Sequence, residues 1–115
     1  MKNSFLSFYN VDFYIFIADE IEDSLLSDDI LRCKTVLSIP LETWNKNSFK
    51  YDITEFCTYL KPHCFEYLFQ THTNVCYFDP DIMFFSSPKF IYDEFIEHDF
   101  LLTPHLIEIN IQQEG

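Results

Sequence analysis

Two carboxylates interrupt an apolar run in the second half of the chain. The segment CYFDPDIMFF places Asp79 and Asp81 two residues apart, with apolar residues on both sides. Pro80 fixes its own φ and favours an extended Asp79, so that both side chains can point to one side. Two neighbouring carboxylates repel each other unless a cation lies between them, and hard divalent cations take such oxygen ligands. The spacing therefore predicts a metal site, with a plain turn as the alternative because Asp and Pro are ordinary turn residues.

Composition limits what such a site can serve. The chain has 115 residues, enough for one small domain, and 48% of them are hydrophobic, which predicts a packed core. The net charge is -12, and the seven basic residues form no cluster. Nucleic acids and anionic membrane surfaces need clustered cations, so neither is an expected partner. A phosphorylated ligand would need a bridging metal ion.

Glycine and cysteine usage excludes several other sites. The single glycine is Gly115, so a phosphate-cradling P-loop, a Gly-rich dinucleotide turn and a G-x-S-x-G nucleophile elbow are all excluded. The four cysteines lack the C-x₂₋₄-C spacing of structural zinc sites. Cys57 and Cys64 are instead predicted to lie in a helix core. Free thiols favour a reducing cytoplasm, the predicted location, and no apolar run reaches the ~18 residues of a membrane span.

Hydrophobic periodicity predicts an α/β fold with a largely parallel sheet. Apolar residues at three-and-four spacing predict helical structure over 51–70, capped by Asp52 or Thr54 and either split or kinked at Pro62. A second helix is predicted to begin near Pro88. The region 22–29 is expected to be a loop or a short helix, and 4–9 to be the end of a helix. Strands are predicted at 12–17, 35–39, 74–78, 82–85 and 99–103. This order places Asp79 and Asp81 at the carboxyl end of a buried strand, where open α/β sheets bind ligands.

Three segments resemble those of a known enzyme family. NVCYFDPDIMFFSSP is similar to the strand and aspartate motif of bacterial GT-A-type nucleotide-diphospho-sugar glycosyltransferases. FKYDITEFCTYLKPHCFEYLF resembles the helical segment before that motif, and FYIFIADE resembles the family's second strand. The resemblance runs from about Phe5 to Leu106. It implies a Rossmann-like GT-A fold that transfers a sugar from a nucleotide donor, such as a UDP-sugar, to a hydroxyl of a glycan or other acceptor.

The same resemblance implies roles for individual residues. Asp79 and Asp81 would bind Mn²⁺ or Mg²⁺, which holds the donor diphosphate, with Asp81 favoured as the direct ligand. Lys61 matches a basic residue near the donor phosphates or the first aspartate, although a surface lysine is the common fate of this residue type. His105 follows the last predicted strand and is a candidate for contact with a sugar. Its alternative is a structural or exposed histidine.

The chain also departs from this family. It lacks the family's first strand, which holds the nucleotide base, and the C-terminal half that binds the acceptor. Residues 1–115 are therefore expected to form a single partial domain, and whether the chain alone is an enzyme stays open. A non-catalytic remnant or interaction module is an alternative. A haloacid-dehalogenase-like phosphotransferase ranks lower, because that family expects Gly-Thr after its aspartate pair and places the pair near the N-terminus, whereas Ile82 and Met83 follow here at mid-chain.

Overall fold

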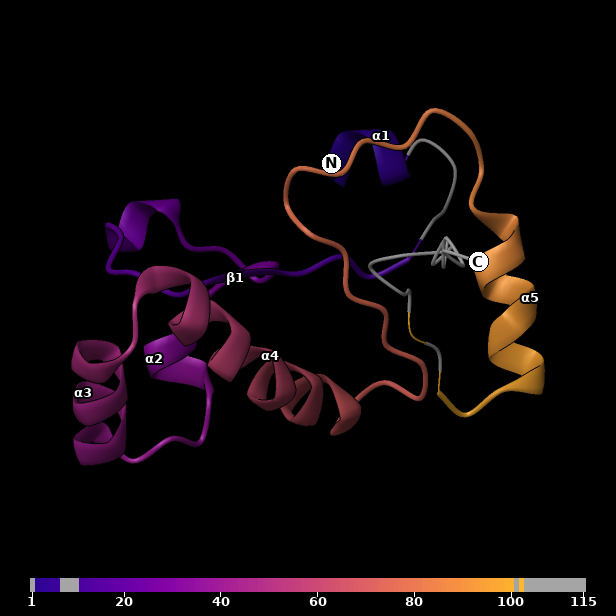
Figure 1. Ribbon diagram of the computed structural model, residues 1–115. Helices are drawn as coiled ribbons and strands as arrows, with labels where there is room; N and C mark the ends of the chain where they lie inside the picture. The colour runs from indigo at the N-terminus through magenta and orange to yellow at the C-terminus, as the bar shows by residue number, and fades with distance from the viewer. Residues whose placement is uncertain (1, 7–10, 101, 103–115) are drawn as a thin grey trace, which may run out of the picture.

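A computed structural model describes residues 2–6, 11–100 and 102 (Figure 1). The described chain is a small mixed α/β structure with one two-stranded parallel sheet. Its elements follow in the order α1 (Lys2–Leu6), β1 (Ile15–Ile17), η1 (Asp23–Leu25), β2 (Ile30–Arg32), α2 (Cys33–Val36), α3 (Leu41–Lys50), α4 (Ile53–Phe69) and α5 (Lys89–Glu97). Within this part of the chain, no helix is long and apolar enough to cross a membrane.

The sheet pairs β1 with β2 in parallel, and Ile15 lies opposite Ile30. β1 falls within the strand predicted at 12–17, and η1 confirms short helical structure within 22–29. β2 was not predicted, because its three residues are not part of a longer apolar run such as the one that contains β1. The strand predicted at 35–39 is wrong. Cys33 and Leu37 are both buried four residues apart, which is helical spacing, and the Leu37 amide donates to the Cys33 carbonyl.

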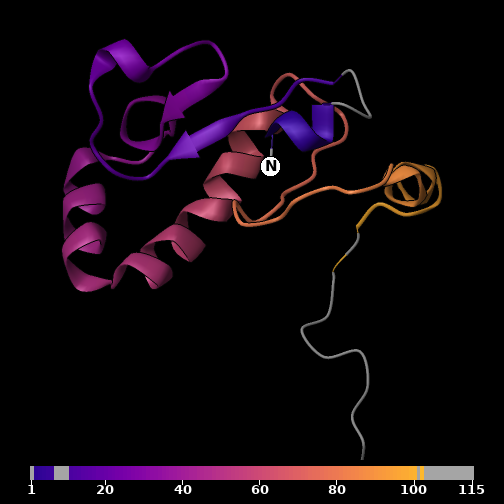
Figure 2. The ribbon, with the colours of Figure 1, turned by 90° about the horizontal axis from the view of Figure 1, so that it is seen from above.

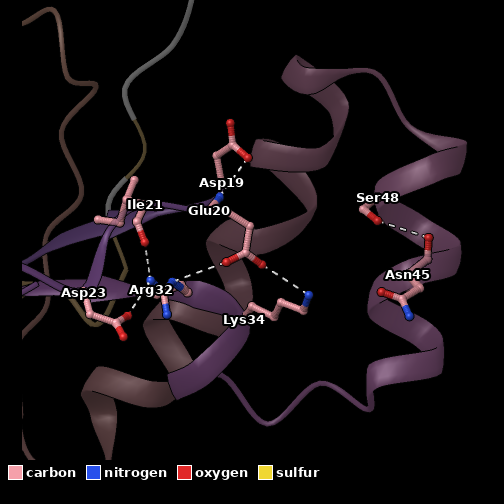
Figure 3. A network of polar contacts seen from close by, with 8 residues as sticks. All are labelled: Asp19, Glu20, Ile21, Asp23, Arg32, Lys34, Asn45 and Ser48. Atoms are coloured by element: carbon pink, nitrogen blue, oxygen red, sulfur yellow. Dashed lines mark hydrogen bonds and ion pairs between the residues drawn. The ribbon is translucent and has the colours of Figure 1, made fainter. Parts of the chain in front are cut away.

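An arginine fixes the connection between the two strands (Figure 3). Arg32 Nη2 donates to the Ile21 carbonyl and, at 2.9 Å, to the Asp23 carboxylate. Its Nε lies 3.6 Å from the Glu20 carboxylate, whose other oxygen accepts from Lys34 at 3.2 Å. One guanidinium at the end of β2 thereby holds three residues of the loop that follows β1.

The main helix, α4, begins at a capping box. The Asp52 carboxylate accepts from the Glu55 amide at 2.8 Å, and the Glu55 carboxylate accepts from the Asp52 amide at 3.1 Å. This satisfies two backbone donors that a helix start leaves unpaired. The helix then continues through Pro62 as a single element, so the helix is not split at that residue.

The core lies between β1 and helices α2, α3 and α4, which gather beside the strands (Figures 1 and 2). Phe56 and Leu60 of α4 are four residues apart and both buried, and Trp44 of α3 meets the Phe56 ring edge-on at 5.1 Å between centroids. The buried residues of the core are Cys33, Leu37, Trp44, Phe56 and Leu60. α5, which confirms the helix predicted near Pro88, lies apart from these helices in both views and has no buried residue.

Two other predicted strands are absent from the described chain. Residues 74–78 and 82–85 form no strand and join neither β1 nor β2. A strand exists only when its backbone pairs with another strand, and neither segment pairs with β1 or β2 in the described chain. The prediction at 99–103 falls partly outside the described residues, and 99, 100 and 102 form no strand.

Candidate functional site

The Asp-Pro-Asp segment forms a hydrogen-bonded turn. The Ile82 amide donates to the Asp79 carbonyl at 3.1 Å, which closes a β-turn over Pro80 and Asp81. Asp79 and Asp81 are both exposed, so they do not follow a buried strand as the sequence pattern predicted. The turn that was the alternative is therefore observed. A turn still presents two carboxylates to solvent, where a cation has access to both.

Aromatic side chains hold both ends of this turn. The ring of Phe78, just before it, meets the ring of Phe84, just after it, edge-on at 4.9 Å between centroids. Phe5 of α1 contacts both, at 5.7 and 5.0 Å. The Phe84 amide also donates to the hydroxyl of Ser4 at 3.1 Å. Ring contacts with α1 therefore anchor the segment that carries the carboxylates.

Two side chains meet the Asp79 carboxylate at one oxygen. The Tyr77 hydroxyl donates to Asp79 Oδ1 at 3.0 Å, and Lys61 Nζ of α4 lies 3.7 Å from the same atom. Lys61 Nζ also lies over the Tyr77 ring, 4.6 Å from its centroid. Of the predicted site residues, the structure thus brings Lys61 and Asp79 together. His105 lies outside the described residues.

The pKa of the Tyr77 hydroxyl is shifted by these contacts. Partial burial, which leaves the residue 45% exposed, raises the pKa of Tyr77 to about 12 together with the hydrogen bond to Asp79 and the negative charge of that carboxylate. Tyr77 is therefore a neutral donor at physiological pH, and it fixes one carboxylate oxygen. The sequence analysis did not select Tyr77, although its i, i+2 spacing to Asp79 on an extended segment was a usable signal.

A cavity of about 650 Å³ lies beside the turn. Its walls come from residues 11–16 around β1, from α4, from residues 74–80 and from α5, and they include Lys61, Tyr77, Asp79 and Pro80. The size is typical of small-molecule sites. His72, whose Nε2 lies 2.9 Å from Asp12 Oδ2, also lines it. The walls are mostly apolar, with charge concentrated at Lys61 and Asp79 near the turn and at Asp12.

The carboxylates suit a metal ion only in part. Throughout the described residues, no three His, Cys, Asp or Glu side chains gather in a way that could hold a metal. Mg²⁺ in particular is commonly held by one or two carboxylates, with substrate phosphates and water as the remaining ligands. Asp79 and Asp81 match that donor set, and Asp81 has no side-chain partner among the contacts described for this turn.

The cysteines differ from their predicted placement. All four are free thiols. Cys57 is exposed, so its assignment to a helix core is wrong, whereas Cys64 packs against the core. The helical pattern placed both on one face because they are seven residues apart, but the core covers only the part of that face near Leu60 and Cys64.

Comparison of the chain with known protein families, curated proteins and solved structures finds no match.

Proposed function

We propose that this chain is the metal-binding part of a GT-A-type glycosyltransferase domain, with Asp79 and Asp81 as ligands of Mn²⁺ or Mg²⁺. The main support for this proposal is the position of Asp79, which Tyr77 and Lys61 contact at the wall of the cavity. Asp81 is exposed two residues away. A diphosphate bound there would meet a cation and the Lys61 ammonium. Such an arrangement lets a chain with a net charge of -12 bind an anion.

Each residue has a distinct role in this proposal. Asp79 and Asp81 would hold the metal ion, which would supply Lewis-acid chemistry for the departure of the diphosphate. Tyr77 orients the Asp79 carboxylate through its hydroxyl. Lys61 neutralises that carboxylate when no metal is bound, and it turns to the diphosphate when the donor arrives. The sugar acceptor would be a hydroxyl group of a glycan or similar molecule.

Calorimetric titration with UDP and with UDP-glucose, with and without Mn²⁺, tests the proposal. We expect binding that requires Mn²⁺ and is lost in Asp81→Asn. Asp93→Asn is the matched control, because Asp93 is an exposed carboxylate on α5 and the charge change is the same. Binding without Mn²⁺, or equal loss in both variants, would overturn the proposal. Absence of any binding by the intact chain would favour the non-catalytic alternative.

Lys61→Met separates metal from diphosphate binding. Because Lys61 competes with a cation for Asp79, its removal should tighten the binding of Mn²⁺ alone and weaken the binding of UDP in the presence of Mn²⁺. Lys50→Met is the control, since Lys50 also lies over a tyrosine ring, that of Tyr51, 5.2 Å from the centroid. Changes of the same sign for both ligands would contradict the role given to Lys61.

A further inference from the structure

Four free thiols line the cavity described above, and two of them belong to helices that are in contact. Cys33, at the start of α2, and Cys64, on α4, both contribute to its wall, as do Cys57 and Cys76. Cys33 is 2% exposed and belongs to the buried core, and Cys64 packs against that core. α2 and α4 are in direct contact. The fold thus brings two thiols from contacting helices to the same core and to the wall of the same cavity.

The two thiols have unequal acidity. The interaction with Cys64, followed by burial, raises the pKa of Cys33. The interaction with Cys33 lowers the pKa of Cys64. Cys64 is therefore the more acidic of the two thiols. Thiol–disulfide exchange begins with a thiolate, so Cys64 is the expected nucleophile, and it is also the more exposed of the two.

A shared metal ion does not explain this cluster. Cys57 and Cys64 lie seven residues apart on α4, about 10 Å along the helix axis. Thiolate ligands of zinc lie about 2.3 Å from the ion, so these two cannot bind one ion together. Among the four thiols, Cys33 belongs to the core and Cys64 packs against it, and the helices that carry them are in contact.

We propose that Cys33 and Cys64 form a reversible disulfide that ties α2 to α4. The oxidant is a low-molecular-weight disulfide such as glutathione disulfide. The Cys64 thiolate attacks one sulfur of the oxidant, forms a mixed disulfide and releases one glutathione thiolate. Cys33 then loses its proton and attacks the Cys64 sulfur, which forms the intramolecular bond and releases the second glutathione thiolate. The two protein thiols are oxidised, one glutathione disulfide is reduced, and the two protons pass to the released glutathione.

Peptide mapping of the intact chain tests this pairing. The protein is incubated with glutathione disulfide, its remaining thiols are alkylated, and it is cleaved after glutamate and after aromatic residues. Tyr59 separates Cys57 from Cys64, so each of the four cysteines falls in its own peptide. We expect a cross-linked Cys33–Cys64 peptide, a loss of two of the four free thiols, and recovery of both on treatment with dithiothreitol.

Cysteine variants distinguish specific pairing of Cys33 with Cys64 from general thiol oxidation. Cys33→Ser should leave Cys64 as a lasting glutathione adduct, because the resolving thiol is absent, whereas Cys76→Ser should form the same cross-link as the wild type. If Cys33→Ser does not fold, the wild-type map still decides. A lasting glutathione adduct on Cys64 in the wild type, pairing with Cys57 or Cys76, a link between two molecules, or four unreacted thiols would each overturn the proposal.

Discussion

At the scale of single residues, the Tyr77–Asp79 contact links local chemistry to pH. Burial and the adjacent carboxylate raise the Tyr77 pKa to about 12, above its ordinary value of 10.0. The neutral phenol is thus favoured in the folded state. Its contribution to stability is fully present below about pH 10 and is lost as the pH rises through 12.

Asp79→Asn tests this contact. The substitution removes the negative charge, so we expect the Tyr77 pKa to fall but to stay above 10, because burial is the largest cause of the shift. The measurement is an NMR titration of ring-labelled tyrosine, with the Tyr77 signal assigned by its absence in Tyr77→Phe. Asp93→Asn should leave that titration unchanged. A Tyr77 pKa that does not respond to Asp79→Asn would show that the two side chains do not interact.

The sequence revealed part of this site. The i, i+2 carboxylates were visible directly, and Lys61 was selected through a resemblance to a family in which a basic residue lies near the first aspartate. The structure places Lys61 Nζ 3.7 Å from Asp79. Phe5 was not selected, because a contact between α1 and residues 78–84 depends on the folded chain and leaves no local pattern. Tyr77 was not selected either, although its i, i+2 spacing to Asp79 is a local signal. The metal itself stays a prediction.

At the scale of elements, helices were predictable and strands were less so. The helix over 51–70 is encoded locally, by the Asp52 cap and by Phe56 and Leu60 at helical spacing. A strand needs a partner elsewhere in the chain, so an apolar, aromatic segment such as 74–78 satisfies the strand pattern without pairing. The same argument explains the failure at 35–39, where local helical contacts prevailed over β-branched residues.

The contribution of the capping box to the stability of α4 can be measured by substituting Asp52. Asp52→Ala removes the acceptor for the Glu55 amide, and we expect the free energy of unfolding to fall by about 1 kcal/mol. Asp52→Asn keeps a good N-cap and should cost less. Chemical denaturation followed by the fluorescence of Trp44, the only tryptophan, measures both. Equal losses in the two variants would indicate that charge, and not the cap hydrogen bond, stabilises this end of α4.

At the scale of the whole molecule, the core occupies one part of the structure. The Cα radius of gyration of the molecule is 17.3 Å, larger than the ~13 Å of a compact domain of this length. Buried residues concentrate around α2, α3 and α4, whereas Phe90 and Ile96 of α5 are 69% and 77% exposed. Among the apolar residues of α5, only Ile91 and Phe95 are partly buried, and both line the cavity. Stability is therefore expected to differ along the chain.

Hydrogen exchange followed by mass spectrometry measures that difference. Amides of α4 near Phe56 and Leu60 should exchange slowly, because opening them disrupts the core, whereas α5 should exchange far faster. Leu60→Ala should speed exchange in α4, since removing a buried leucine costs about 2–5 kcal/mol. Phe49→Ala, at a residue 95% exposed on α3, should leave it unchanged. A series of protein concentrations is the further control, because self-association would cover α5. Exchange in α5 as slow as in α4 at every concentration would contradict a core confined to the region of α2, α3 and α4.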